Sequence, residues 1–418
     1  MIAKVSALAI GMAINLIVSR HYGAETVGTL ALLNSLIALI SMLCMAGMQV
    51  SILRRVPEKL AMGRGEEASA FFYGTVAIST LVGVTVTVLL LPYTEAISRY
   101  LFDDRSISSL IVPMALSATA LSLFTLSQRA VRALGHIKIF SLLQIATPVL
   151  NLFLLSTSAI YFYDPYNPIY TEFASFFIVS AISFYIVKKL FEPFSRSGDG
   201  AIQLPFSDIV SLSLPMFLSS AMSTVISQTD TLMLGLFLTQ KDVGIYAIAF
   251  KLAVLAGFIQ SAINTIAAPK FSHLYHSDDR ERLASIAVKS TLSVLLISLP
   301  IYLSLLFFGK EILSIFGDGF VPGYDTLAIL CVGQLSASIS GLGGTMLNMT
   351  GGEKVLRNIT LASALLNITL NLLLIPRFGI EGAAVAGSVA LTLASIAILI
   401  SVKRHLGFGM LSLSSIAR

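Results

Sequence analysis

The sequence predicts an all-α integral membrane protein with about twelve transmembrane helices in two six-helix halves around a central cavity. Three observations lead to this prediction. The chain of 418 residues is 56% hydrophobic and only 12% charged, whereas a soluble domain is about one quarter charged. Apolar runs of about 20 residues, enough to cross a hydrocarbon core about 30 Å thick, recur along the whole chain. The pattern of the first half returns in the second half.

Each apolar run is separated from the next by turn residues or charges, and none of the loops is long enough for a separate water-soluble domain. The alternation of polar and apolar residues that marks a membrane β-barrel is absent, so the spans are predicted to be helices. We expect spans at residues 3–20, 27–53, 68–93, 107–132, 138–162, 169–190, 207–238, 242–269, 284–308, 324–348, 354–376 and 380–402.

Basic residues predict the orientation of these helices. Most of the 27 Lys and Arg residues, Arg129 among them, fall at the cytoplasmic face if the N-terminus is cytoplasmic, and cytoplasmic loops carry the positive excess. An even number of spans then places both termini in the cytoplasm. The first apolar run continues through Ser19-Arg20-His21 without a cleavage site, so we interpret it as a retained span. We therefore expect a multi-pass protein of the cell inner (plasma) membrane, and we interpret the net charge of +5 as topology, with no nucleic-acid partner.

An internal duplication divides the chain. One constant shift, close to half the chain length, superimposes several motifs without gaps: Val27-Gly28 on Val243-Gly244, Gly135 on Gly351, Lys138 on Lys354, and Asn151 on Asn367. Two halves of six spans start on the same side, which indicates a parallel repeat of the kind found in transporters. The predicted organisation is an N-terminal six-helix half at residues 1–190, a cytoplasmic linker at 191–206, a C-terminal six-helix half at 207–402 and a cytoplasmic tail at 403–418.

The sequence offers little support for an enzyme. The Gly-rich stretches at 341–344 and 351–352 lack the Lys-Ser or Lys-Thr of a phosphate-binding loop. Cys44 and Cys331 both lie inside apolar runs, which excludes a disulfide framework or a CxxC site. His273 and His276 have a metal-ligand spacing but precede an ordinary charged loop. We therefore expect no catalytic residues, no metal and no cofactor.

Charged residues inside predicted spans are the informative ones, because a charge at membrane depth is costly and faces a partner or a cavity. Lys251 lies nine residues beyond Asp242, which places it about 13 Å below the outer surface. Asp230 lies at a similar depth on the preceding helix. Two interpretations stay open: an ion pair that locks the two helices together, or a cation that faces the central cavity while Asp230 sets its charge state.

Uncharged polar residues at membrane depth allow two interpretations as well. Asn151 and Asn367 are equivalent under the repeat and lie in mid-helix, where an interhelical hydrogen bond is the ordinary role and a place on the substrate path is the alternative. One helix carries a stripe of hydroxyl residues that either lines a water path or lets helices pack closely: Ser220, Thr224, Ser227 and Thr231. Glycines at 341, 343 and 344 weaken the tenth span, and discontinuous helices are common beside transport sites.

Several motifs resemble those of lipid-linked oligosaccharide flippases. Ser19-Arg20-His21-Tyr22-Gly23, followed by Val27-Gly28, resembles the family's signature after the first helix, and Val243-Gly244-Ile245-Tyr246 resembles the motif that opens the eighth. The most specific match is the stretch in the eleventh and twelfth spans with Asn367, Asn371, Pro376, Gly379 and Gly382. The resemblance covers nearly the whole chain. It points to the multidrug, oligosaccharidyl-lipid and polysaccharide flippase superfamily, and within it to the Wzx-like branch.

This resemblance implies a secondary flippase, which moves a polyprenyl-pyrophosphate-linked oligosaccharide repeat unit from the cytoplasmic to the outer leaflet by alternating access. The product would feed surface polysaccharide such as O-antigen, with membrane lipid and a polysaccharide polymerase as further partners. Arg and Lys side chains that face the central cavity are the expected anchors of the diphosphate. Arg20 matches the signature arginine of the family, and depth and charge nominate Lys251 and Lys4. The candidate substrate path is therefore Arg20, Lys251, Asp230, Lys4, Asn151 and Asn367.

Two other functions compete with this one. A cation-coupled multidrug exporter of the same superfamily would prefer acidic residues in its cavity, and Asp230 is the one such residue that the depth argument selects. A membrane polysaccharide polymerase or glycosyltransferase belongs to a different class and normally needs a sizeable outer loop, which the predicted spans leave no room for.

Overall fold

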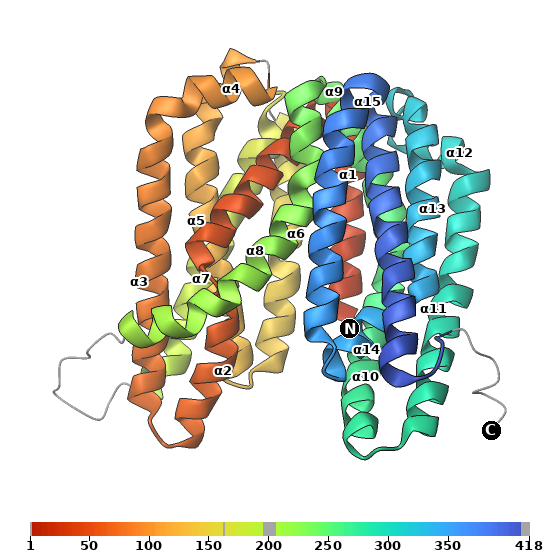
Figure 1. The fold of residues 1–418 in the computed structure, drawn as a ribbon. Helices are drawn as coiled ribbons and strands as arrows, with labels where there is room; N and C mark the ends of the chain where they lie inside the picture. Colours follow the sequence, from red (N-terminus) through yellow and green to blue (C-terminus); the bar gives the residue numbers. More distant parts are fainter. Residues whose placement is uncertain (1, 103, 162–163, 195–205, 411–418) are drawn as a thin grey trace. The chain divides into compact units, whose positions relative to one another are not determined.

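A computed structural model describes residues 2–102, 104–161, 164–194 and 206–410 of the chain (Figure 1). Every regular element in these ranges is an α-helix or a short 3-10 helix, so the predicted all-α class is confirmed. Helices suit the apolar sequence because an α-helix satisfies its backbone N–H and C=O groups within itself, where a hydrocarbon solvent offers no partners.

The helices form two compact units. The first unit contains residues Met1–Tyr22 and Thr29–Leu236. Its elements are α1 (Ile2–Met45), α2 (Met48–Ala61), α3 (Gly65–Leu90), η1 (Leu91–Tyr93), α4 (Thr94–Phe102), η2 (Arg105–Ile107), α5 (Ser108–Ala133), α6 (Ile137–Tyr161), α7 (Asn167–Phe191), η3 (Glu192–Phe194) and α8 (Phe206–Phe237).

The second unit contains residues Phe237–Arg418 together with the short segment Gly23–Gly28 from within α1. Its further elements are α9 (Gln240–Ala253), η4 (Val254–Ala256), α10 (Gly257–His276), α11 (Arg280–Phe307), α12 (Gly309–Phe316), η5 (Asp318–Gly323), α13 (Tyr324–Ser340), α14 (Gly343–Met349) and α15 (Glu353–Leu406). Most of the predicted linker, residues 195–205, and the end of the predicted tail, 411–418, lie outside the described residues. The division into two six-helix halves stays a prediction.

The helices reproduce the predicted spans in number. Among the described residues, eight helices are long and apolar enough to cross a membrane, or ten when two bent pairs each count as one span. Two of these helices are 43 and 54 residues long, about 65 and 80 Å, which exceeds twice the thickness of a hydrocarbon core. Each is interrupted by a non-helical glycine, Gly23 in α1 and Gly379 in α15. Dividing both helices there gives the twelve predicted spans.

The break at Gly379 turns α15 back on itself. This glycine has φ 59° and ψ −136°, a conformation that strongly favours glycine. Figure 1 shows the two resulting arms of α15 side by side, and Ser363 Oγ on the first arm donates a 3.0 Å hydrogen bond to the Ala390 carbonyl on the second. α15 is therefore a helical hairpin.

Some predicted spans are less regular than the sequence suggested. The run at 27–53 is not one helix, because α1 ends at Met45 and α2 begins at Met48 after Gly47, which has φ 83°. A Cβ at Gly47 would lie 2.3 Å from the Ser213 carbonyl oxygen, so the close approach of α8 requires this glycine. The run at 242–269 is interrupted by η4, and the run at 324–348 breaks between α13 and α14.

The element order repeats at an offset close to the one that superimposes the sequence motifs. α3, α4 and α5 correspond to α11, α12 and the pair α13–α14, and α6 and α7 correspond to the two arms of α15. The glycine turns match as well, since Gly135 has φ 82° and Gly351 has φ 84°. The buried clusters of the two units contain equivalent residues, including Leu126 with Leu342 and Val131 with Leu347. The duplication in the sequence thus has a counterpart in the backbone.

Candidate substrate path

The signature glycines of the two repeats pack against each other in the second unit. A Cβ added to Gly28 would lie 1.8 Å from the Gln240 carbonyl oxygen, and one added to Gly244 would lie 1.9 Å from the Ala24 carbonyl oxygen. Ala24 and Gln240 are related by the same shift as the two glycines, so the contact is symmetric under the repeat. Backbones can approach this closely only where side chains are absent.

The start of α9 is fixed by a capping box beside this contact. Thr239 Oγ1 accepts from the Asp242 backbone N–H at 3.4 Å, and Asp242 Oδ2 accepts from the Thr239 backbone N–H at 3.3 Å. Such reciprocal bonds satisfy backbone donors that the first turn leaves open. The capping box therefore fixes where α9 begins, four residues before Gly244.

A carboxylate at membrane depth lies in the first unit, where the sequence interpretation did not place one. Asn34 Nδ2, on α1, lies 3.2 Å and 3.3 Å from the two carboxyl oxygens of Glu172, on α7. Glu172 lies five residues into α7, about 8 Å along its axis, and both side chains are half-buried. Their location inside the predicted spans 27–53 and 169–190 was the signal that would have identified them.

A second charge at depth is Arg129. The charge pattern placed this residue at the cytoplasmic surface, but it lies within α5, four residues before the end of the helix, and is half-buried. Its Nε is buried and makes no hydrogen bond within the part of the chain that the structure describes. Gln128, Arg129 and Arg132 share one stripe of α5 with Thr125, at helical spacing. This stripe places cationic and polar groups at the end of α5 that is predicted to face the cytoplasm.

Charged residues on α2, α3 and α8, together with Arg64 between α2 and α3, form two groups of ion pairs within the first unit. Lys59 pairs with Glu67, which also lies 3.7 Å from Arg64. Arg55 pairs with Glu58 at 2.9 Å and with Asp208 at 3.7 Å. Exposed pairs of this kind contribute little individually, but Lys59 is only 9% exposed. The Arg55–Asp208 pair links the start of α8 to α2, and the Lys59–Glu67 pair links α2 to α3.

The tenth span is discontinuous, as the glycines predicted. Gly341 separates α13 from α14 with φ 56° and ψ −127°, and the two helices meet at 41°. Gln260 Nε2, on α10, donates a 2.7 Å hydrogen bond to the Gly341 carbonyl. Because a break in a membrane helix leaves carbonyls without helical partners, this amide replaces a lost backbone bond. A Cβ at Gly341 would lie 2.5 Å from Thr291 Oγ1.

The predicted charged site residues lie in different places. Arg20 and Lys4 are exposed on the first arm of α1, and Asp230 is half-buried on α8, all within the first unit. Lys251 is half-buried in the last turn of α9, in the second unit, three residues before η4 begins. A cation there compensates the negative end of the helix dipole. The pairing of Asp230 with Lys251 stays a prediction, because the two residues belong to different units.

The two predicted asparagines share their degree of burial. Asn151 on α6 and Asn367 on the first arm of α15 are each 8% exposed. Asn371 Nδ2 donates to Asn367 Oδ1 at 3.2 Å. Asn151 Oδ1 is buried and makes no hydrogen bond with the described residues. Both repeats therefore carry a buried amide at this equivalent position.

The hydroxyl stripe of α8 bonds mainly to its own helix. Ser220 donates to the carbonyls of Met216 and Phe217, Thr224 donates to the Ser220 carbonyl, and Ser227 donates to the Thr224 carbonyl. These bonds satisfy the hydroxyls locally. They leave the choice between a water path and close helix packing open.

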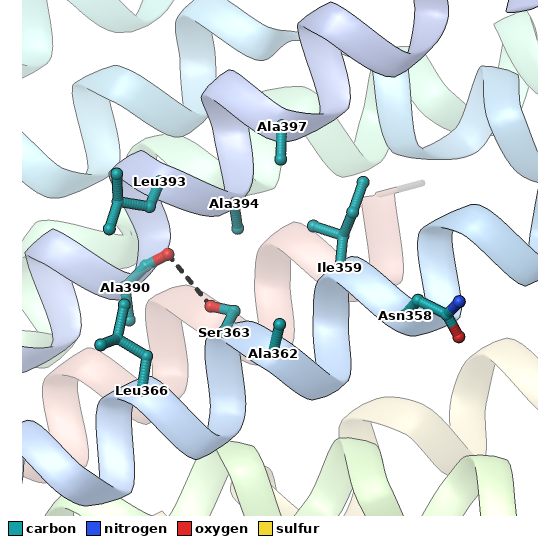
Figure 2. A pocket seen from close by; sticks show the side chains of 9 residues that line it. All are labelled: Asn358, Ile359, Ala362, Ser363, Leu366, Ala390, Leu393, Ala394 and Ala397. Carbon is teal, nitrogen blue, oxygen red and sulfur yellow. Dashed lines mark hydrogen bonds between the residues drawn. The ribbon is translucent and has the colours of Figure 1, made fainter.

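A groove lies between the two arms of α15 (Figure 2). Its volume is about 420 Å³, and its walls are almost entirely apolar. Figure 2 shows the small side chains that line it: Ala362 and Ser363 on the first arm, and Ala390, Ala394 and Ala397 on the second. Asn358 lies at one end.

Comparison with known families agrees with this fold. The sequence model of the polysaccharide biosynthesis protein family matches residues 1–275, and that of the MatE family matches residues 215–373. The chain therefore belongs to the polysaccharide biosynthesis protein family. Its predicted membership of the multidrug, oligosaccharidyl-lipid and polysaccharide flippase superfamily is confirmed, whereas the Wzx-like branch stays a prediction.

Two similar proteins come from Haloferax volcanii. The probable low-salt glycan biosynthesis flippase Agl15 is 24% identical over 371 residues, which cover 88% of this chain and 74% of that protein. The probable flippase AglR is 25% identical over 401 residues, which cover 94% of this chain and 80% of that protein. Both relatives are named as flippases and not as enzymes.

Two solved structures share the fold. The inward closed conformation of the lipid II flippase MurJ superimposes with a TM-score of 0.78 at 17% identity, and covers 96% of this chain and 87% of its own. The inward-facing conformation of a multidrug resistance MATE family transporter of the MOP superfamily has the same TM-score and identity, and covers 96% and 94%. The chain is a multi-pass membrane transporter of this superfamily.

Proposed function

We propose that the chain is a secondary flippase, which moves a polyprenyl-pyrophosphate-linked oligosaccharide repeat unit from the cytoplasmic to the outer leaflet by alternating access. The observation that carries the proposal is the match of the polysaccharide biosynthesis family over residues 1–275. The names of Agl15 and AglR, both flippases, support it. The substrate is a lipid-linked glycan, and no covalent bond is made or broken.

The diphosphate sets the first chemical requirement. Two phosphates that leave water need cationic or strongly donating groups along their path, whereas the lipid tail can stay in the bilayer. Arg20, Lys251 and Lys4 are the anchors nominated from the sequence, and Arg129 joins them because its guanidinium is half-buried within α5. Asp230 would set the charge state near Lys251.

The sugars set the second requirement. Sugar hydroxyls are recognised by groups that both donate and accept hydrogen bonds, and amides do both. Asn151 and Asn367 offer amides at equivalent positions of the two repeats, and the buried Asn151 Oδ1 has an open acceptor among the described residues. We assign them to the sugar-binding part of the path.

The cellular setting follows from the direction of transport. The chain would reside in the cell inner (plasma) membrane with both termini cytoplasmic, as its positive loops predict. A polysaccharide polymerase that takes up the unit on the outer face is the expected partner. O-antigen is one surface polymer that such units build.

A cation-coupled multidrug exporter is the second candidate. One observation favours it, namely the carboxylate of Glu172 at membrane depth beside Asn34, because acidic residues in an apolar cavity attract cationic drugs. The MATE transporter of the same fold agrees with this alternative as well as with the flippase. A polymerase or glycosyltransferase has no comparable support.

Deletion of the gene in its native host separates the candidates. The proposal predicts loss of surface polysaccharide together with complete lipid-linked repeat units that accumulate on the cytoplasmic leaflet. Units that reach the outer face but stay unpolymerised would indicate a polymerase. Unchanged surface glycan with altered sensitivity to cationic drugs would indicate the exporter.

A further inference from the structure

The short helix α14 packs against both arms of α15 beside the groove. α14 follows the break at Gly341 and presents two glycines to the hairpin. A Cβ at Gly343 would lie 2.7 Å from Ile398 on the second arm, and one at Gly344 would lie 3.5 Å from Leu356 on the first arm. Small residues normally let membrane helices close on each other. Here the alanines of the two arms face a gap instead.

The groove opens on an apolar face. Large apolar side chains beside it on both arms are exposed, namely Leu361, Leu365, Ile396 and Ile400, at 38%, 65%, 47% and 47%. An exposed apolar patch of this kind on a membrane-spanning helix pair fits hydrocarbon and not an aqueous lumen. The groove is thus suited to a hydrocarbon chain.

One end of the groove is basic on both arms. Asn358 lines the groove, and Lys354 lies one turn before it on the same stripe of the first arm. Ala397 lines the groove, and Arg404 lies seven residues after it on the same stripe of the second arm. Lys354 and Arg404 are both exposed. A ligand with an apolar chain and an anionic head would therefore contact apolar side chains along its chain and basic side chains at its head.

We propose that this groove binds the first isoprene units of the lipid carrier, with its diphosphate at Lys354 and Arg404. The inference rests on the proposed function and adds a location for the part of the substrate that stays in the bilayer. Among anionic lipids, the two cations on separate arms favour a diphosphate, since two phosphates can contact both at once. The hairpin then presents the carrier lipid at the end of the second unit that is predicted to be cytoplasmic.

The test uses the full chain in lipid vesicles with two photoreactive probes. One is farnesyl diphosphate with a diazirine on its second isoprene unit, and the other is phosphatidylglycerol with a diazirine on its acyl chain. The first probe is expected to label residues 358–366 and 390–397, and unlabelled farnesyl diphosphate should compete while free pyrophosphate should not. Equal labelling by both probes would mean only bulk lipid in the groove and would overturn the proposal.

Matched variants locate the probe. Ala394→Phe fills the groove and should lower the labelling at least about tenfold, as should Ala362→Phe from the opposite arm. Leu373→Phe places a ring on the exposed surface of the first arm, outside the residues that line the groove, and should leave the labelling unchanged. Unchanged labelling in both groove variants, each folded as judged by size-exclusion chromatography, would overturn the proposal.

Transport measured in the same vesicles separates this proposal from the proposed function. If the parent chain moves a lipid-linked oligosaccharide while the groove stays unlabelled, the groove assignment fails and the flippase stands. If the parent chain moves no lipid-linked oligosaccharide, the flippase fails whatever the labelling shows.

Discussion

Gly28 and Gly244, which occupy equivalent positions of the two repeats, cross so closely that neither position has room for a Cβ. The contact joins equivalent backbone atoms of the two repeats, with Ala24 and Gln240 as the facing residues. Residues Gly23–Gly28 group with the second unit although the rest of α1 belongs to the first. The crossing is therefore one place where residues of the two repeats pack against each other.

Alanine at either glycine should disturb this crossing. A methyl group at Gly28 or Gly244 would overlap backbone, which cannot rotate away as a side chain can, and overpacking costs about 1 to 3 kcal/mol. Gly28→Ala and Gly244→Ala should each lower the thermal unfolding midpoint of the purified protein and reduce transport. Gly257→Ala is the control, because a Cβ there meets nothing within 4 Å. Equal midpoints for all three variants would contradict the close contact.

The Asn34–Glu172 contact should couple the two residues in stability. Removing one partner leaves a polar group at membrane depth without its bond, which costs about 1 to 3 kcal/mol. Asn34→Ala and Glu172→Ala should each destabilise the protein, and the double variant should cost less than the two separate losses together. Unfolding in detergent measures this cycle. Fully additive losses would show that the two side chains act independently.

The same carboxylate tests the exporter alternative. Glu172→Gln keeps the shape and removes the charge, so a structural contact should tolerate it while cation coupling should not. We expect glycan transport to continue in Glu172→Gln. Loss of transport with an unchanged unfolding midpoint would give this carboxylate a coupling function instead.

The break in the tenth span depends on Gln260. Gln260→Leu removes the 2.7 Å bond to the Gly341 carbonyl and should destabilise the protein by about 1 to 3 kcal/mol, because a buried carbonyl loses its partner. Gln260→Glu can accept but not donate when ionised, so it should not restore the bond. A midpoint in Gln260→Leu equal to that of the parent chain would mean that the carbonyl finds another donor.

Charge exchange separates the two interpretations of Lys251 and Asp230. If Lys251 anchors the diphosphate, Lys251→Ala should abolish surface glycan without lowering the level of protein. If Asp230 pairs with Lys251, the single variant Asp230→Lys should lose function. The double variant Lys251→Asp and Asp230→Lys, which exchanges the two charges, should regain it. Loss of folded protein in Lys251→Ala would instead favour a structural ion pair.

Much of the fold was predictable because membrane solvation acts on long stretches of sequence. The number of spans, the turns near Gly23 and Gly379 and the break at Gly341 all follow from apolar length and glycine position. The break at Gly47 was missed, because its cause is the backbone of α8, which is distant in the sequence. Close approaches of this kind depend on tertiary structure, so no local sequence pattern predicts them.

The site was less predictable than the fold for a related reason. The distribution of positive charge predicts Arg129 at the cytoplasmic surface, although it lies half-buried within α5. Glu172 was overlooked because a single acid in an apolar run gives no sign of its partner Asn34, 138 residues away. The equal burial of Asn151 and Asn367, by contrast, agrees with the equivalence that the repeat gave them.

Reconstitution tests the central claim most directly. The full chain is placed in vesicles that contain a radiolabelled polyprenyl-diphosphate oligosaccharide, and a membrane-impermeant glycosidase measures how much of the lipid is accessible from outside. If the chain is a flippase, accessibility rises from the outer-leaflet share to nearly all of the lipid when the chain is present, and Lys251→Ala prevents the rise. Accessibility that stays at the outer-leaflet share with folded parent chain, while a cationic dye is transported, would contradict the proposed function.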